Sequence, residues 1–140
     1  MADDARPTVQ RSSGVPTLAA LLRLPRDAQA PALARQLVRR LCADAAVADG
    51  VSETVVLLTS ETVTNSVLHG RGRVQLRASS GSGCIRVEVA DGSRRAPVTA
   101  PVGAQDESGR GVRLMQQCAS SWGVDVRRRG KTVWFEVATA

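Results

Sequence analysis

The chain has 140 residues, of which 43% are hydrophobic and 23% are charged, a balance typical of one globular domain. No apolar run reaches the roughly 18 residues of a membrane-spanning helix, and the N-terminus lacks the apolar core of a signal peptide. These features favour a cytoplasmic protein over a membrane-spanning or secreted one. The cysteines Cys42, Cys84 and Cys118 stand far apart, which favours buried reduced thiols over a metal site or disulfides.

Basic residues outnumber acidic ones, 19 against 13, which gives a net charge of +6 and predicts an anionic partner. A nucleotide and a nucleic acid both meet this condition. The chain has no tyrosine, two tryptophans and one phenylalanine, so it offers no aromatic platform for stacked bases. A basic nucleic-acid-binding module is therefore the weakest of the functional classes considered.

The chain divides into a tail and one domain. Residues 1–25 are expected to form an N-terminal tail that is partly disordered, in which the apolar stretch 17–24 is either a helical turn or an edge strand. Residues 26–140 are expected to form the domain. Its first helix begins near residue 28, since proline is tolerated only in the first helical turn, and its second spans 52–69. The later elements are strands over 74–78 and 85–89 around a turn at 79–83, a long loop over 92–110, a helix over 111–120, and strands over 123–127 and 131–138.

This order of elements predicts an α+β fold. Strands that follow one another in sequence pair antiparallel, and the helices must cover one face of the resulting sheet. We therefore expect a two-layer sandwich with a mainly antiparallel sheet. The long loop over 92–110 is typical of a binding lid, although a tolerated surface insertion would have the same pattern.

The second predicted helix carries polar residues in an unusual setting. Glu61, Asn65 and His69 are spaced four apart, so they share a helical stripe about 80° wide. Leucines 57, 58 and 68 lie on or beside this stripe, which predicts that the helix is buried around much of its circumference. Buried polar groups need partners. A ligand and a neighbouring loop capped by these side chains fit this pattern equally well.

Two further motifs follow along the chain. Asp91 ends the second strand of the predicted hairpin, where its carboxylate could accept a hydrogen bond from the amino group of adenine and would repel the carbonyl of guanine. Asp-Gly is also a common turn signal. Gly109, Arg110 and Gly111 then open a helix, whose backbone N–H groups and positive end attract phosphate. A simple glycine N-cap would look the same.

In their order, these motifs resemble the GHKL (histidine-kinase-like) ATP-binding family. SETVTNSVLHG is similar to the N-box of the family, and VEVADGS and ESGRGVRLMQQCASSWGV are similar to its two glycine boxes. The closing GKTVWFEV resembles the last strand of small actinobacterial stand-alone members related to anti-sigma-factor serine/threonine kinases. The resemblance covers about residues 27–138 and implies the Bergerat-type ATP-binding fold.

The resemblance also implies roles for individual residues. Asn65 would ligate Mg²⁺, and Glu61 would be the catalytic base. Asp91 would read the adenine of ATP, with help from Ser93 and Thr132. Residues 109–111, which are Gly109, Arg110 and Gly111, would hold the phosphates. His69 would orient Asn65 or the turn that follows it.

The function that the resemblance implies is transfer of the ATP γ-phosphate to a serine or threonine of a partner protein. The expected partner is an anti-sigma antagonist, with a sigma factor as a further partner. The alternative is a non-catalytic regulator that binds ATP and thereby changes its affinity for a partner. The sequence leaves formation of a homodimer open. It departs from the family pattern at Asp91-Gly92-Ser93, where Asp-x-Gly is more common.

Overall fold

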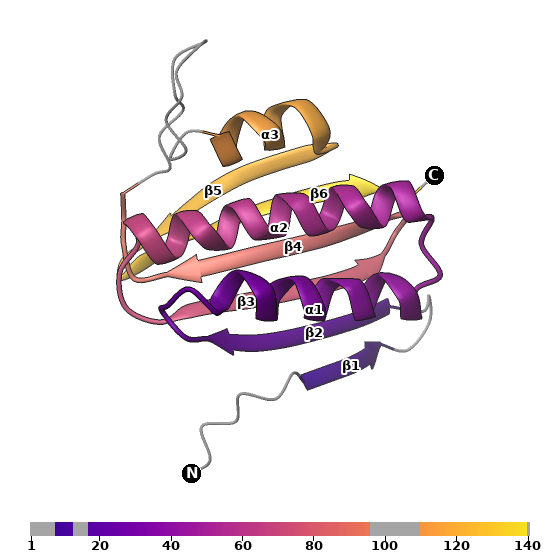
Figure 1. Cartoon of the computed structure of the whole chain (residues 1–140), viewed down its shortest axis with the longest axis horizontal. Coiled ribbons are helices and arrows are strands. Elements are labelled where there is room, and N and C mark those ends of the chain that lie inside the picture. Colours follow the sequence, from indigo (N-terminus) through magenta and orange to yellow (C-terminus); the bar gives the residue numbers. More distant parts are fainter. Residues whose placement is uncertain (1–7, 13–16, 96–109, 140) are drawn as a thin grey trace.

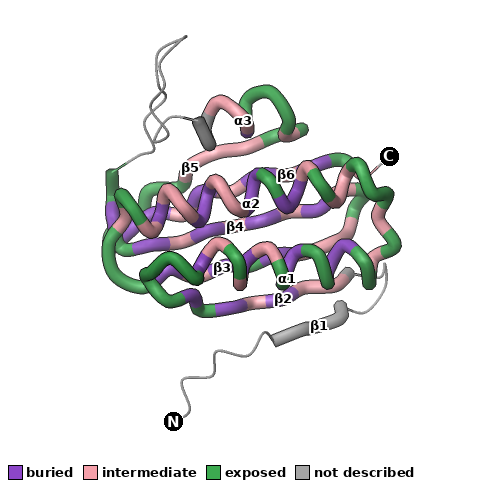
Figure 2. Tube along the Cα trace, viewed as in Figure 1, coloured by how far each residue is buried: buried purple, intermediate pink, exposed green. Residues whose placement is uncertain are grey.

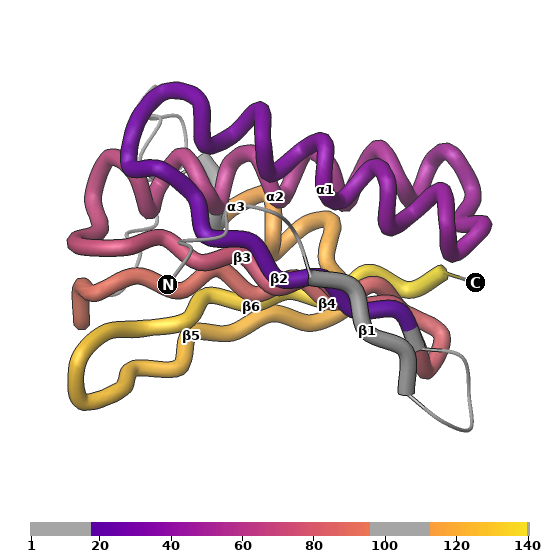
Figure 3. The backbone as a smooth tube through the Cα atoms, turned by 90° about the horizontal axis from the view of Figure 1, so that it is seen from below, coloured from indigo at the N-terminus to yellow at the C-terminus, as the bar shows by residue number. Residues whose placement is uncertain are grey.

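The computed structural model describes residues 8–12, 17–95 and 110–139 and has two layers, a sheet and a layer of helices on one of its faces (Figures 1 and 3). The six strands of the described residues are antiparallel and lie in the order β1-β2-β3-β4-β6-β5. In chain order the elements are β1 (Thr8–Ser12), β2 (Thr17–Leu24), α1 (Ala30–Asp44), α2 (Asp49–His69), β3 (Val74–Gly81), β4 (Cys84–Asp91), α3 (Arg110–Cys118), β5 (Ser121–Arg127) and β6 (Gly130–Ala138). The predicted two-layer α+β fold is confirmed.

The N-terminal part of the sheet differs from the prediction. Residues 17–24, placed in the predicted tail, form β2, which is an inner strand because it pairs with both β1 and β3. Leu22 pairs with Leu76, and both are buried beneath the helices. The short apolar run TLAALLRL has no clear period, so the pattern alone could not separate a strand from a helical turn. The rest of the predicted tail, residues 1–7 and 13–16, lies outside the described residues.

The hydrophobic core lies between the helices and the sheet (Figure 2). The buried residues of α2 form one stripe that faces the sheet: Val55, Val56, Leu58, Thr59, Thr62, Val63 and Ser66. Leu57 and Leu68 are 44% and 61% exposed, so the prediction that α2 is buried around much of its circumference is wrong. None of the described helices is both long and apolar enough to span a bilayer.

The β3–β4 hairpin closes with a two-residue turn. Ser82 and Gly83 have φ angles of 55° and 76°, as a type I′ turn requires. The strands therefore continue to Gly81 and Cys84, where the sequence predicted a longer turn over 79–83. This register places Val87, Val89 and Asp91 on the face of β4 that the helices cover.

No described helix covers the opposite face of the sheet, which carries a polar cluster centred on Arg86. Its guanidinium donates to Glu136 Oε2 at 2.9 Å and lies 4.3 Å from the ring centroid of Trp134. The hydrogen bond from Arg86 lowers the pKa of Glu136 below its ordinary value. Because these groups are partly exposed, the pair stabilises the fold only modestly.

The end of α2 is fixed closely against the end of β4. Gly70 follows the helix, and its N–H donates to the Ser66 carbonyl at 3.0 Å. A Cβ atom at Gly70 would lie 2.5 Å from Asp91 Oδ2 and 2.5 Å from the Ser66 carbonyl oxygen. The φ angle of Gly70 is an ordinary −82°, so lack of space requires glycine here.

We predict that Gly70→Ala lowers the free energy of unfolding by roughly 1 to 3 kcal/mol, because the added methyl group overpacks this contact. Gly50→Ala is the matched control at the other end of α2, where a Cβ meets nothing within 4 Å. Urea unfolding measures both. Equal midpoints for the two variants would show that α2 and β4 do not meet closely at Gly70.

Candidate functional site

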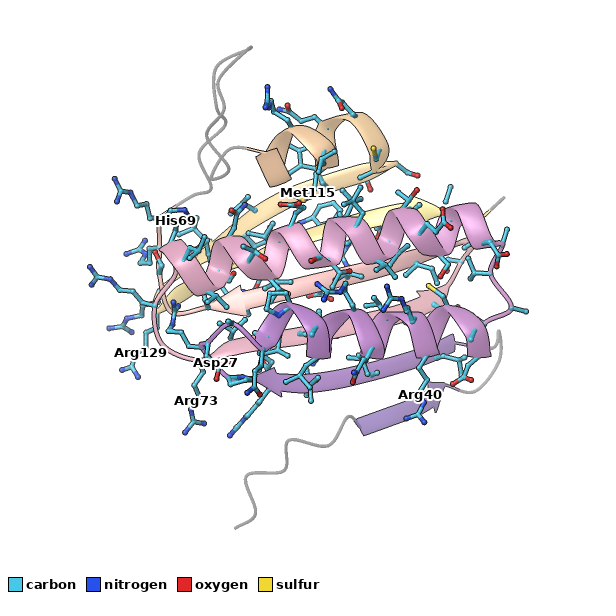
Figure 4. The ribbon with its side chains drawn as sticks, viewed as in Figure 1. Asp27, Arg40, His69, Arg73, Met115 and Arg129 are labelled. Carbon is cyan, nitrogen blue, oxygen red and sulfur yellow. The ribbon has the colours of Figure 1, made fainter. Side chains whose placement is uncertain are left out.

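One end of the molecule gathers the motifs that the sequence singled out. The C-terminal end of α2, the end of β4 and the N-terminal end of α3 all lie at this end (Figure 1). His69, Arg73 and Arg129 mark it in Figure 4. Residues that are distant in the sequence therefore meet at this end.

The centre of this end is the carboxylate of Asp91, whose side chain is 0% exposed. Lys131 Nζ lies 3.0 Å from both Asp91 oxygens, and only 6% of the Lys131 side chain is exposed. Ser66 Oγ on α2 donates to Oδ2 at 2.9 Å. The Ser93 N–H donates to Oδ1 at 2.8 Å. Asp91 thus joins α2, the loop after β4 and the start of β6.

Lys131 is the site residue that sequence reasoning missed. Residues directly opposite each other in an antiparallel pair share a face of the sheet, and Lys131 is opposite Asp91. Thr132 is opposite Ala90 and so lies on the uncovered face. The structure does not bring Thr132 to Asp91. The signal was present in the sequence, since the alternation along β6 assigns the two residues to opposite faces once the register is known.

Ser93 stabilises the loop that follows β4. Its N–H binds Asp91, and its Oγ accepts a hydrogen bond from the Arg95 N–H at 3.1 Å. Ser93 is 7% exposed. The structure therefore brings Ser93 to Asp91, as expected, in a contact that orients the carboxylate.

Glu61 and Asn65 lie on the side of α2 that faces α3. Thr62 Oγ1 lies 3.9 Å from Met115 Sδ of α3, whereas Ser60 Oγ accepts from Arg35 Nη1 of α1 at 3.0 Å. At about 100° per residue, Glu61 and Asn65 lie on the α3 side of the stripe that contains Thr62 and Ser66. Both are half-buried. His69, on the last turn, is exposed.

The structure describes only part of the predicted phosphate-binding motif. Arg110 and Gly111 are the first residues of α3, so the helix begins one residue earlier than the predicted start at residue 111. Gly109 and the predicted lid over 96–109 lie outside the described residues. The first turn of a helix has backbone N–H groups without partners inside the helix, and the positive end of the helix dipole lies there.

The same end of the molecule is strongly basic on the uncovered face of the sheet. A pocket of about 300 Å³ there is lined by Arg23, Arg73, Gln75, Ala90, Asp91, Gly92 and Arg129. The Asp91 carboxylate itself is buried and paired with Lys131. This concentration of guanidinium groups raises the local concentration of anions around the site.

These residues fit Mg²⁺ and an adenine nucleotide. Asn65 is half-buried on α2, and its amide oxygen is the kind of hard ligand that Mg²⁺ takes. A magnesium ion that bridges phosphates needs one or two protein ligands, so a single amide is sufficient. The carboxylate of Asp91 is the type of acceptor that an adenine amino group requires, and in this structure it accepts from Ser66, Ser93 and Lys131.

Comparison with known proteins gives a family match for most of this chain. A family profile described as a histidine kinase-like ATPase domain matches residues 24–137. Among solved structures, the chain is similar to the histidine kinase domain of a blue-light activated histidine kinase from Erythrobacter litoralis EL346, at 29% sequence identity and a TM-score of 0.49. That match covers 64% of this chain and 45% of the other. The search of curated proteins found no match.

The profile match spans most of the sequence, from the last residue of β2 to the penultimate residue of β6. It includes α2 with Glu61 and Asn65, the Asp91 cluster and the start of α3. The chain therefore belongs to the histidine kinase-like ATPase family.

Proposed function

We propose that this protein is an ATP-dependent regulator that transfers the γ-phosphate of ATP to a serine or threonine of a partner protein. The observation that carries the proposal is the placement of Glu61 and Asn65 on the α3-facing side of α2, beside the buried Asp91 cluster. The site thus offers a carboxylate for a proton, an amide for a metal ion and a helix N-terminus for phosphate. Phosphoryl transfer depends mainly on positioning and charge neutralisation, which these groups supply.

Asn65 is the proposed ligand of Mg²⁺. Magnesium prefers oxygen ligands, and it neutralises the charge that develops on the transferred phosphoryl group. A neutral amide is suited to this place because it adds no negative charge beside a triphosphate. Arg110 and Gly111 open α3 at the same end of the fold, where the helix N-terminus favours phosphate oxygens. We include Gly109 in this phosphate-binding group.

Glu61 is the proposed general base. It takes the proton from the attacking hydroxyl as the bond from that oxygen to the γ-phosphorus forms. The bond between the γ-phosphorus and the oxygen that bridges it to the β-phosphate breaks, and ADP leaves with that oxygen. The location of Glu61 one helical turn before Asn65 supports this role, because base and metal ligand then face the same side of α2.

Asp91 is the proposed reader of the base. Its carboxylate accepts a hydrogen bond from the adenine amino group, and Ser93 holds the carboxylate in place through its N–H. Thr132 has no part in this proposal because it lies opposite Ala90 on the other face of the sheet. His69 is proposed to have a structural role at the end of α2.

The resemblance to anti-sigma-factor kinases suggests the partner. We propose an anti-sigma antagonist as the phosphoryl acceptor, with a sigma factor as a further partner, in the cytoplasm. The basic pocket around Arg73 and Arg129 supports an acidic surface on the partner. Whether two copies of the chain associate is an outcome of the same binding experiments.

We predict that Asn65→Ala weakens Mg-ATP binding at least tenfold, or by about 1.4 kcal/mol, because it removes the protein ligand of Mg²⁺. Thr64→Ala is the matched control. Thr64 precedes Asn65, and its hydroxyl donates to the Ser60 carbonyl on another side of α2 at 2.7 Å. Isothermal titration calorimetry measures both variants. Equal affinities for the two would remove Asn65 from the site.

We predict that Glu61→Gln leaves ATP binding nearly unchanged and lowers phosphoryl transfer about 10² to 10⁴-fold, because the amide cannot take up the proton. Transfer is measured with radiolabelled ATP and candidate anti-sigma antagonists. Glu53→Gln, an exposed acid in the first half of α2, is the control and should transfer normally. ATP binding by the wild type without a labelled acceptor would favour the non-catalytic regulator instead.

A further inference from the structure

The ion pair between Asp91 and Lys131 raises a question that the proposed function does not answer. If Asp91 reads a base, its carboxylate must have an acceptor site to offer. In the structure, the carboxylate is enclosed and Lys131 contacts both of its oxygens. The chain has a single lysine among its 19 basic residues, and that lysine is Lys131.

The acceptor capacity of Asp91 is already filled. An ionised carboxylate offers about four lone-pair sites. Oδ1 accepts from the Ser93 N–H at 2.8 Å and from Lys131 at 3.0 Å, and Oδ2 accepts from Ser66 Oγ at 2.9 Å and from Lys131 at 3.0 Å. An incoming amino group can therefore bind Asp91 only if one of these donors leaves.

Lys131 is the donor that can leave. The Ser93 donor is a backbone N–H in a loop that the hydrogen bond from the Arg95 N–H to Ser93 Oγ also holds. Ser66 is held in the buried stripe of α2. Lysine carries its ammonium on a flexible four-carbon stem, which rotates without moving the backbone. Its release breaks a buried ion pair and needs another anion or water as partner, so the released state is the minor one.

We infer that Lys131 is a latch on the base-reading site. Its ammonium competes with the adenine amino group for Asp91 and so lowers the affinity of the free protein for ATP. This inference rests on the proposed function. The apparent dissociation constant of a ligand rises in inverse proportion to the fraction of protein in the competent state. A partner that offers Lys131 an acidic group would raise that fraction and strengthen ATP binding.

The test compares Lys131→Met with Arg127→Met by calorimetry with Mg-ATP. Both variants lose one positive charge, but Arg127 is an exposed residue of β5, whereas Lys131 binds both oxygens of Asp91. Loss of charge alone weakens triphosphate binding in both. We expect Lys131→Met to bind Mg-ATP about tenfold tighter than the wild type, as a shift to the competent state requires. Inorganic tripolyphosphate, which has no base, should show no such gain. Weaker or unchanged Mg-ATP binding by Lys131→Met would overturn the latch.

A second measurement does not depend on the variant being stable. In wild-type protein grown with ¹³C-labelled lysine, Lys131 gives the single side-chain Cε signal of the chain. We expect this signal to shift as Mg-ATP saturates the site, because the ammonium leaves Asp91. ATP binding without a shift overturns the latch and leaves the proposed function standing. No ATP binding by either the wild type or Lys131→Met overturns the proposed function and the latch with it.

Discussion

A single buried carboxylate holds the functional end of this protein together. Asp91 is bonded to Ser66 of α2, to the Ser93 N–H and to Lys131 of β6, and Gly70 leaves the space that it fills. Burial of a charge is costly unless it is paired and hydrogen-bonded, so these contacts together stabilise the buried carboxylate. The result is a fixed geometry between the end of α2 and the end of the sheet. Glu61 and Asn65 take their positions from that geometry, because they lie on the same helix as Ser66.

This arrangement connects stability with function. In the proposed function, a base that binds Asp91 uses a group on which the local packing also depends, so nucleotide binding and the Asp91–Lys131 pair then exclude each other in part. Ser66 and Gly70 then serve both the fold and the site. The basic pocket on the uncovered face adds a long-range attraction for anions at the same end. A regulator whose ligand must break an internal ion pair can respond to any partner that makes this break easier.

Much of the fold could be predicted from the sequence because local patterns agree with it. The alternation in 74–78 and 85–89 identified β3 and β4, and the glycines after His69 marked the end of α2. The prediction left residues 17–24 open between a helical turn and an edge strand, and this apolar run joins the sheet as the inner strand β2. The prediction that α2 is buried around much of its circumference was wrong because Leu57 and Leu68 are exposed. An exposed leucine cannot be told from a buried one by residue type alone. Strand pairing decides the first case and the packing of α2 against the sheet decides the second, and no local pattern contains either.

Local sequence patterns also predicted part of the candidate site. Helical spacing was enough to place Glu61 and Asn65 on one side of α2, and the strand end was enough to single out Asp91. That Lys131 and not Thr132 lies beside Asp91 follows only from the register of β6 against β4, which is a long-range property. Calorimetric titration of the wild-type protein with Mg-ATP and with Mg-GTP tests the central claim most directly, namely that Asp91 reads the base. The account predicts a dissociation constant for Mg-ATP at least about tenfold lower, since a carboxylate accepts from the adenine amino group and repels the guanine carbonyl. Equal affinity for the two nucleotides would contradict it.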